Sequence, residues 1–186
     1  MLRPISQNFR GLITISGPAN SGKSQFAEFL IKEQKAITYI ATSKPRKNDQ
    51  DWTRRISIHR RRRPESWKLI EYPNDICKAI DSIDKHETIL IDSLGGLVEQ
   101  HLIKNDAQWK VFETRLVKYL TKKNNYGFIV VIEEIGWGVV PSTPIGNLFR
   151  ERLSNLSLLL SRNSKKRWLA VNGTAIDLDK IGNNIP

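Results

Sequence analysis

The sequence has one cysteine, no long apolar run and no apolar leader, and each absence excludes a class of protein. Cys77 has no partner for an internal disulfide, which excludes a disulfide-stabilised secreted domain and indicates a reducing compartment. The apolar runs, such as residues 128–132, are far shorter than the roughly 20 residues of a membrane-spanning helix. The first residues are polar and basic, unlike a secretory signal peptide. We therefore expect a cytoplasmic protein without a transmembrane segment.

Acidic residues are scarce relative to basic ones. The 186 residues hold 30 Lys and Arg against 19 Asp and Glu, a formal net charge of +11. Residues 44–63 carry nine of the basic residues against Asp49 and Asp51, so the positive charge is concentrated in one segment. Such a segment favours a polyanionic partner: nucleic acid, an acidic membrane surface or a nucleoside triphosphate. The length and the 39% hydrophobic content fit a single domain over residues 1–186.

Short apolar segments alternate with amphipathic ones along the chain. The short segments are rich in Ile, Val and aromatic residues and predict strands at 12–15, 37–41, 67–72, 88–91, 128–132 and 168–171. Amphipathic segments at 23–35 and 109–122 predict helices. Asn172-Gly173 is typical of a two-residue turn that leads into a further strand at 174–178. We therefore predict an α/β fold: a mostly parallel sheet flanked by helices, with an antiparallel C-terminal edge strand.

A glycine-rich loop follows the first predicted strand. Its sequence is Gly17-Pro-Ala-Asn-Ser-Gly22-Lys23-Ser24, which fits the GxxxxGK[ST] phosphate loop in its strand-loop-helix context. In such a loop the backbone N–H groups and the helix N-terminus bind phosphates. Lys23 would reach the β and γ phosphates, and the Ser24 hydroxyl would ligate Mg²⁺. The loop predicts a phosphate-loop NTPase-like fold and a nucleoside triphosphate substrate.

Acidic residues stand where two predicted strands end. Asp92 ends the strand at 88–91, the usual place for the carboxylate that holds the metal in phosphate-loop proteins, although the following Ser-Leu-Gly-Gly also fits a helix N-cap. Glu133 and Glu134 end the strand at 128–132 in the same way. Ligands of open α/β sheets bind at the carboxyl ends of strands, so we expect these acids to face the nucleotide. The Asn-Lys-x-Asp guanine motif is absent, and no local pattern identifies the base.

A run of arginines surrounds one histidine in the segment Arg55-Ile-Ser-Ile-His59-Arg60-Arg-Arg-Arg63-Pro64. Three interpretations remain open from the residues alone. The run could bind nucleic-acid phosphates without sequence specificity, or be a solvated charged helix. It could also be a site in which cations keep His59 neutral, as a nucleophile must be, and stabilise departing pyrophosphate. His86 and His101 lack metal-ligand spacing, and we expect both at the surface.

Five segments in order resemble the bifunctional adenosylcobinamide kinase / adenosylcobinamide-phosphate guanylyltransferase family of cobalamin synthesis. They are the phosphate loop, Ala41-Thr42-Ser43, the motif Arg55-Ile-x-x-His59-x-x-x-Arg63-Pro64-x-x-Trp67, the acid at Asp92, and Glu134-Ile-Gly136-Trp-Gly138-Val-Val-Pro141. The resemblance runs from about residue 12 to residue 182. It implies two reactions: phosphorylation of adenosylcobinamide by ATP or GTP, and transfer of GMP from GTP through a guanylyl-histidine.

The resemblance also implies roles for individual residues. The guanylylated histidine corresponds to His59, and Lys23, Asp92 and Glu134 complete the expected catalytic set, with Ser24 and Asp92 on Mg²⁺. The expected nucleotide-binding residues are Gly17, Pro18, Ala19, Asn20, Ser21, Gly22, Lys23, Ser24, Ala41, Thr42, Ser43, Arg60, Arg61, Arg62, Arg63, Glu71 and Asp92. The family further implies a homotrimer, with adenosylcobinamide and nucleotides as partners and no specific nucleic acid.

The sequence departs from the family pattern at two places. Asn20 stands where the family commonly has Arg, and the segment after Phe149-Arg150 has Ser154, Ser157 and Leu158 where the family usually has Gly, Asn and Gln. Two other functions stay open from the phosphate loop and the arginine run: a phosphate-loop kinase for a different small molecule, and a basic, nucleotide-dependent nucleic-acid-binding protein.

Overall fold

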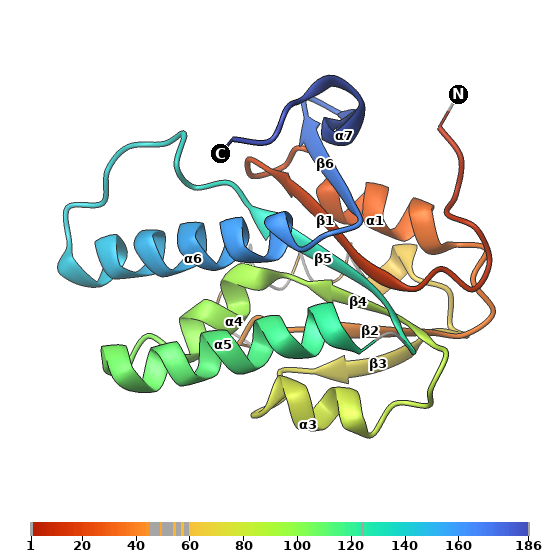
Figure 1. Ribbon diagram of the computed structural model, residues 1–186, viewed down its shortest axis with the longest axis horizontal. Coiled ribbons are helices and arrows are strands. Elements are labelled where there is room, and N and C mark those ends of the chain that lie inside the picture. Colours follow the sequence, from red (N-terminus) through yellow and green to blue (C-terminus); the bar gives the residue numbers. More distant parts are fainter. Residues whose placement is uncertain are drawn as a thin grey trace.

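A seven-stranded sheet forms the centre of the protein (Figure 1). The structure is a computed structural model and describes residues 2–44, 49, 54, 57, 60–123 and 125–185. The sheet has the order β3-β2-β4-β5-β1-β6-β7, and every pairing is parallel except that of β6 with β7. The strands are β1 (Gly11–Gly17), β2 (Ile37–Ala41), β3 (Lys68–Glu71), β4 (Thr88–Asp92), β5 (Gly127–Glu133), β6 (Lys166–Val171) and β7 (Thr174–Asp177). The predicted fold class, including the antiparallel edge strand, is confirmed.

Helices cover both faces of the sheet. One face packs against α3 (Ile76–Asp81), α4 (Leu94–Gln100), α5 (Asp106–Lys122) and α6 (Pro144–Arg162), and the other against α1 (Lys23–Ile31). Successive side chains of a strand point to opposite faces, so Ile89 and Ile91 join the first core while Leu90 joins the second. A last short helix, α7 (Leu178–Ile181), follows β7. Because both faces are covered, the inner strands are mostly apolar.

Several predicted boundaries shift for local reasons. The helix expected to reach residue 35 ends at Ile31, and the strand expected to 72 ends at Glu71, because Tyr72 has a positive φ of 45°. The helix expected from 109 begins at Asp106, because Asn105 and Gln108 form a reciprocal capping box. His101, expected at the surface, is partly buried against Phe112. Side-chain caps and packing of this kind decide boundaries that hydropathy alone leaves open.

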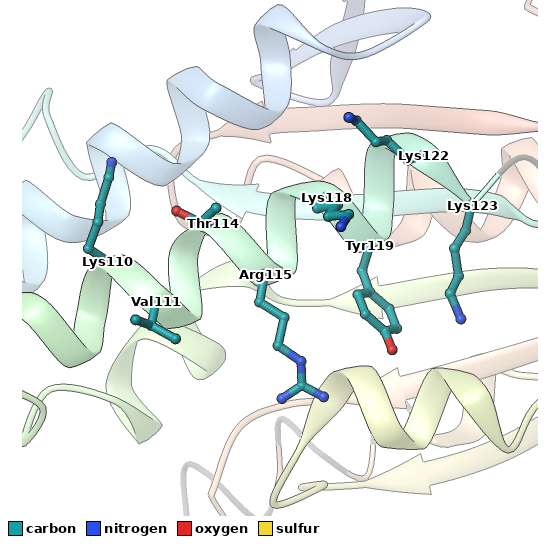
Figure 2. Close-up of a pocket in the computed structure, with 8 residues that line it drawn as sticks. All are labelled: Lys110, Val111, Thr114, Arg115, Lys118, Tyr119, Lys122 and Lys123. Atoms are coloured by element: carbon teal, nitrogen blue, oxygen red, sulfur yellow. The ribbon is translucent and has the colours of Figure 1, made fainter.

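The outer face of α5 carries a shallow surface pocket of about 600 Å³ (Figure 2). Arg115 pairs with Asp75 at 2.9 Å, and Lys123 pairs with Asp81. Acids at α3 therefore neutralise part of the positive charge that lines the pocket. The pocket is lined by Lys110, Val111, Thr114, Arg115, Lys118, Tyr119, Lys122 and Lys123. None of these residues belongs to the phosphate loop or to the acids expected to face a nucleotide. The pocket is therefore a feature of the helix surface.

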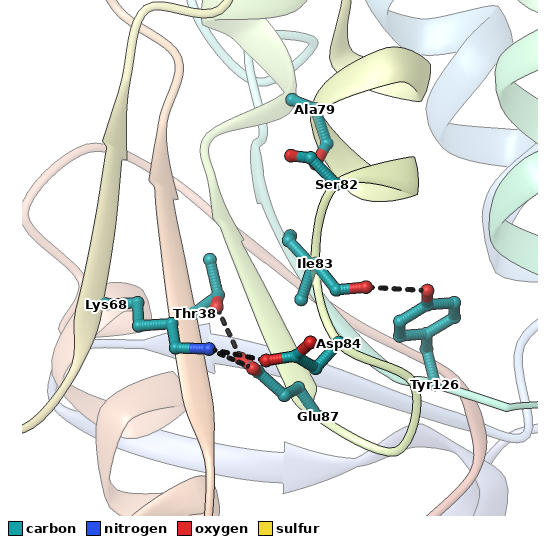
Figure 3. Close-up of polar contacts among 8 residues, drawn as sticks. All are labelled: Thr38, Lys68, Ala79, Ser82, Ile83, Asp84, Glu87 and Tyr126. Atoms are coloured by element: carbon teal, nitrogen blue, oxygen red, sulfur yellow. Dashed lines mark hydrogen bonds and ion pairs between the residues drawn. The ribbon is translucent and has the colours of Figure 1, made fainter.

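A buried carboxylate joins three strands at the amino ends of β2 and β4 (Figure 3). Glu87 is 3% exposed and accepts hydrogen bonds from the Thr38 hydroxyl and the Lys68 ammonium, both at 2.6 Å. Lys68 also pairs with the exposed Asp84 at 3.0 Å. Since Lys68 is the first residue of edge strand β3, Glu87 ties that strand to its neighbours.

We expect Glu87→Ala to lower the free energy of unfolding by about 1–3 kcal/mol, because the buried Thr38 hydroxyl loses its acceptor. Urea denaturation followed by circular dichroism measures the change. Asp84→Ala is the matched control and should leave stability close to that of the wild type, because its carboxylate is exposed to water. Equal losses from the two variants would contradict this account.

A buried arginine closes the turn between α4 and α5. Arg152 of α6 is 4% exposed, and its guanidinium donates to the carbonyl oxygens of His101, Leu102 and Lys104 at 2.8–3.4 Å. It also lies 4.8 Å from the centre of the Trp109 ring. Carbonyl groups at the end of a helix have no partner within that helix, and Arg152 satisfies them from a neighbouring one.

Two further findings concern the helices and the single cysteine. Among the described residues, no helix is both long enough and apolar enough to cross a membrane. Cys77 is a free thiol buried in the core, and burial raises its pKa to about 11. This cysteine is therefore a packing residue and not a reactive thiol at neutral pH.

Candidate functional site

The phosphate loop connects β1 to α1. Gly17 and Gly22 have φ values of +153° and +93°, and Asn20 between them has a φ of 57°. These backbone conformations suit glycine and asparagine, so the loop can turn back over the N-terminus of α1. The Lys23 ammonium donates to the Pro18 carbonyl at 2.5 Å, and the side chain lies across the loop with 8% exposure. The strand-loop-helix context predicted from the sequence is confirmed.

Neighbouring elements hold the loop from two sides. A Cβ atom at Gly17 would lie 2.1 Å from the Ala170 carbonyl oxygen of β6, so only glycine fits there. The Gly173 N–H at the β6–β7 turn donates to the Ser21 carbonyl at 3.3 Å, and the Glu134 N–H donates to the Gly17 carbonyl at 2.8 Å. The C-terminal hairpin and the end of β5 thus fix the backbone that would bind phosphates.

Asp92 ends β4, and β5 lies between β4 and the phosphate-loop strand β1. The Tyr39 hydroxyl donates to Asp92 Oδ2 at 2.6 Å. Burial and the Asp92 carboxylate raise the pKa of Tyr39 well above its usual value, so the phenol stays protonated and keeps donating. The N-cap of α4 is Ser93, so the alternative role of Asp92 as that helix cap is wrong.

The two glutamates at the end of β5, Glu133 and Glu134, accept hydrogen bonds from neighbouring residues. Glu133 accepts a hydrogen bond from the Ser93 hydroxyl and one from the Gly95 N–H at 3.0 Å, and burial raises its pKa. Glu134 Oε1 accepts from the Gly136 N–H at 2.7 Å. Glu133 therefore holds the start of α4, and Glu134 shapes the loop that follows β5.

The segment after β2 packs against the residues that follow Asp92. The Thr42 hydroxyl is fully buried and donates to the Ser93 carbonyl at 2.6 Å. A Cβ atom at Gly96 would lie 2.3 Å from that hydroxyl oxygen, so α4 approaches β2 very closely. Ala41 lies opposite Asp92 on one side and Glu71 on the other. The carboxyl ends of β2, β3 and β4 therefore meet at one edge.

The expected nucleophile His59 lies outside the described residues. The arginines that follow it are described, and three of them contact protein groups. Arg60 lies 3.5 Å from Glu71, Arg62 lies 3.3 Å from Glu28, and Arg63 lies 4.2 Å from the centre of the Tyr39 ring. Arg61 is exposed. The end of the basic run therefore lies beside the carboxyl ends of β2 and β3.

Sequence reasoning missed Glu28 and Tyr39. Glu28 follows Ser24 by four residues on α1, so both project from the same face of the helix, a spacing that could have identified it. Burial raises the pKa of Glu28, although Arg62 opposes this shift. Tyr39 carries a hydroxyl in the buried strand β2. A hydroxyl in a buried strand needs a partner, and here that partner is Asp92.

The loop after β5 exposes apolar side chains. Trp137 and Val140 are more than half exposed, and Val139 is almost fully exposed. Arg150 of α6 donates to the Gly136 carbonyl at 2.9 Å and fixes the base of this loop. Because the Glu134 N–H donates to the Gly17 carbonyl, the loop starts directly beside the phosphate loop.

The donor atoms at the site fit a magnesium ion that is shared with a nucleotide. Ser24 and Asp92 offer a hydroxyl and a carboxylate, which are oxygen ligands of the kind that Mg²⁺ prefers. No group of three or more His, Cys, Asp or Glu side chains in the described part of the chain could form a metal site. Mg²⁺ in nucleotide enzymes needs one or two carboxylates plus substrate phosphates, so such a group is not required.

The glycine-rich loop between β1 and α1, with Lys23 folded over it and Asp92 at the end of β4, defines a phosphate-loop nucleotide-binding α/β protein. A solved protein of Pyrococcus horikoshii OT3 shares this fold, with a TM-score of 0.55 and 9% identity over 96% of this chain and 93% of that one. Residues 13–178 match the cobinamide kinase / cobinamide phosphate guanyltransferase family, and the chain belongs to that family.

Two relatives match nearly the whole chain. The bifunctional adenosylcobalamin biosynthesis protein CobU of Escherichia coli (strain K12) is 26% identical over 181 residues, which cover 90% of this chain and 99% of that protein. The bifunctional adenosylcobalamin biosynthesis protein CobP of Pseudomonas aeruginosa is 29% identical over 166 residues, or 88% of this chain and 95% of that protein. The family resemblance found in the sequence motifs is confirmed.

Proposed function

We propose that the protein phosphorylates adenosylcobinamide with a nucleoside triphosphate and then transfers GMP from GTP to the new phosphate, giving adenosylcobinamide-GDP. The observation that carries this proposal is membership of the cobinamide kinase / cobinamide phosphate guanyltransferase family over residues 13–178. Its bifunctional relatives in cobalamin synthesis support both reactions. The phosphate loop supports the nucleotide substrate, and the apolar loop beside it supports an acceptor with the apolar faces of a corrin ring.

In the kinase step, the oxygen of the acceptor hydroxyl attacks the γ phosphorus, the bond between that phosphorus and the β–γ bridging oxygen breaks, and the hydroxyl proton is released to water. The loop from Gly17 to Ser24 would bind the phosphates through its N–H groups, and Lys23 would neutralise charge on the β and γ oxygens. Ser24 and Asp92 would hold Mg²⁺, which when bound supplies charge neutralisation across the phosphates. Positioning and electrostatics supply most of the catalysis in such transfers.

In the guanylyl step, a His59 ring nitrogen attacks the α phosphorus of GTP and pyrophosphate leaves. The phosphate made in the kinase step then attacks the same phosphorus, the N–P bond breaks, and His59 is regenerated. Splitting the displacement into two steps is the advantage of a covalent intermediate. Arg60 to Arg63 and Glu71 belong to the nucleotide-binding set that the family implies.

Three further statements belong to the same proposal. We place the protein in the cytoplasm, where ATP, GTP and a reduced Cys77 coexist. The family implies a homotrimer. The seven strands of one sheet span residues 11–177, which supports a single nucleotide-binding domain.

The test is to incubate the protein with Mg²⁺ and GTP labelled at either the α or the γ phosphate. We expect acid-labile, base-stable label on the wild type from the α position alone, and none on His59→Asn, because only an N–P bond to histidine carries GMP. His86→Asn is the matched control and should label like the wild type, since His86 is an exposed residue between α3 and β4. Adenosylcobinamide added afterwards and phosphorylated by the same protein should discharge the label.

The other outcomes identify the rival functions. Transfer of the γ phosphate without any protein-bound GMP would indicate a phosphate-loop kinase for another small molecule. Tight binding to DNA or RNA that falls steeply with salt, without either transfer, would indicate a nucleotide-dependent nucleic-acid-binding protein.

A further inference from the structure

The end of the basic run is anchored on α1 by a two-point ion pair. Arg62 Nε lies 3.3 Å from Glu28 Oε2, and Arg62 Nη2 lies 3.3 Å from Glu28 Oε1. Two guanidinium nitrogens thus meet both carboxylate oxygens, the arrangement that gives arginine pairs their directionality. The Glu28 side chain is only 11% exposed, so water screens this pair less than a surface pair. The pair fixes residue 62 relative to the helix that begins at the phosphate loop.

The next residue has a second anchor. The Arg63 guanidinium lies 4.2 Å from the centre of the Tyr39 ring, within the range of a cation–π contact. The Tyr39 hydroxyl in turn donates to Asp92. Consecutive arginines therefore contact two different elements, α1 and β2.

Both anchors connect to groups that would bind the nucleotide. Glu28 is one helical turn beyond Ser24, and Tyr39 holds the carboxylate of Asp92. His59 directly precedes Arg60 in the sequence. A residue that attacks phosphorus must approach it to about 3–3.5 Å, and an error of about 1 Å can reduce the rate a hundredfold. Anchors on residues 62 and 63 therefore fix the chain that directly follows the expected nucleophile in the sequence.

We propose that Glu28, through Arg62, and Tyr39, through Arg63, are positioning residues that hold the arginine segment at the nucleotide site for attack by His59 on the α phosphorus. This inference rests on the proposed function. The nucleophile of the kinase step is the acceptor hydroxyl, which is not part of this chain. We therefore expect the rate of γ-phosphate transfer to depend less on these anchors than the rate of guanylyl transfer does. Weakening the Glu28–Arg62 pair should slow guanylyl transfer selectively.

The experiment compares both steps in one protein preparation under single-turnover conditions with saturating GTP. For Glu28→Gln we expect the rate of α-label incorporation to fall about tenfold or more, while γ-phosphate transfer to adenosylcobinamide changes less than about threefold. Glu33→Gln is the matched control, because Glu33 is an exposed acid two residues after α1 ends. Circular dichroism and the melting temperature show whether each variant is folded.

A charge swap separates positioning from direct nucleotide contact. Glu28→Arg combined with Arg62→Glu rebuilds the ion pair with its partners exchanged. If Arg62 acts through Glu28, the double variant should recover guanylyl transfer relative to either single change. If Arg62 instead acts only by contacting the nucleotide, glutamate at position 62 will not restore the rate, and the positioning role is overturned.

The remaining outcomes are distinct. Label on the wild type with an unchanged guanylyl rate in Glu28→Gln overturns the positioning role alone. An equal loss of both steps in Glu28→Gln also overturns it, because the damage is then general. The absence of label on the wild type overturns the proposed guanylyl step itself, and with it this inference.

Discussion

Lys23→Ala should lower the rate of γ-phosphate transfer by a factor on the order of a hundred to a thousand. This factor is typical when one charged or hydrogen-bonding group that stabilises the transition state is removed. Lys23 opens α1 directly after the glycine-rich loop, and its ammonium already lies within that loop at 2.5 Å from the Pro18 carbonyl. In the proposed kinase step this ammonium would contact the β and γ phosphates. Its loss removes a positive charge where negative charge is transferred.

Single-turnover transfer from γ-labelled nucleotide measures the effect. Lys35→Ala is the matched control, because Lys35 is exposed beyond the end of α1 and should have wild-type activity. We expect the melting temperature of Lys23→Ala to stay near that of the wild type, because the Pro18 carbonyl can bind water instead. A variant with wild-type transfer would show that this loop does not bind the reacting phosphates.

Arg152→Ala should be the most destabilising of the single changes considered, with a loss of about 3–5 kcal/mol in the free energy of unfolding. The guanidinium serves three carbonyl groups between α4 and α5 and covers the Trp109 ring. Alanine leaves a cavity beside that ring and removes the charged donor from all three carbonyls. For a chain of this length the melting temperature should fall by about 10 °C.

The ion pair of Arg152 with Asp106 contributes little to this loss, because the Asp106 side chain is fully exposed. Asp106→Ala is therefore the control, and we expect almost no change in stability. Thermal melts of the two variants with the wild type decide the matter. If Asp106→Ala were as unstable as Arg152→Ala, the carbonyl contacts would not be the source of the effect.

Local sequence patterns were sufficient to predict much of the fold. The strand, loop and helix over residues 11–31 follow from an apolar run and a glycine-rich motif that are contiguous in sequence. The strand order was not predictable in the same way. Hydropathy shows that β1 and β4 are buried strands, but it does not show that β5 separates them. That order depends on which helices cover which face, a long-range property of the whole chain.

The candidate site likewise contains residues that the sequence identifies and residues that it does not. Lys23 and Asp92 were identified because each occupies a position that its motif defines. Glu28, Tyr39 and Arg152 were not identified. Each is a polar residue in a largely buried helix face or strand, and its role depends on a partner that is distant in sequence. Such residues can be suspected when a charged side chain interrupts a buried stripe, as Arg152 does beside Leu153 and Leu156.

The position of β1 between β5 and β6 has a consequence for synthesis on the ribosome. The phosphate-loop strand is the first of the seven to be made, yet Ile13 pairs with Ile129 on one side and with Lys166 on the other. The backbone of Gly17 also packs against Ala170. A nascent chain that has not yet delivered β6 would lack one wall of this loop, however early the loop itself emerged. Nucleotide should therefore be unable to promote folding of the growing chain and should act only as a late ligand that selects the finished sheet.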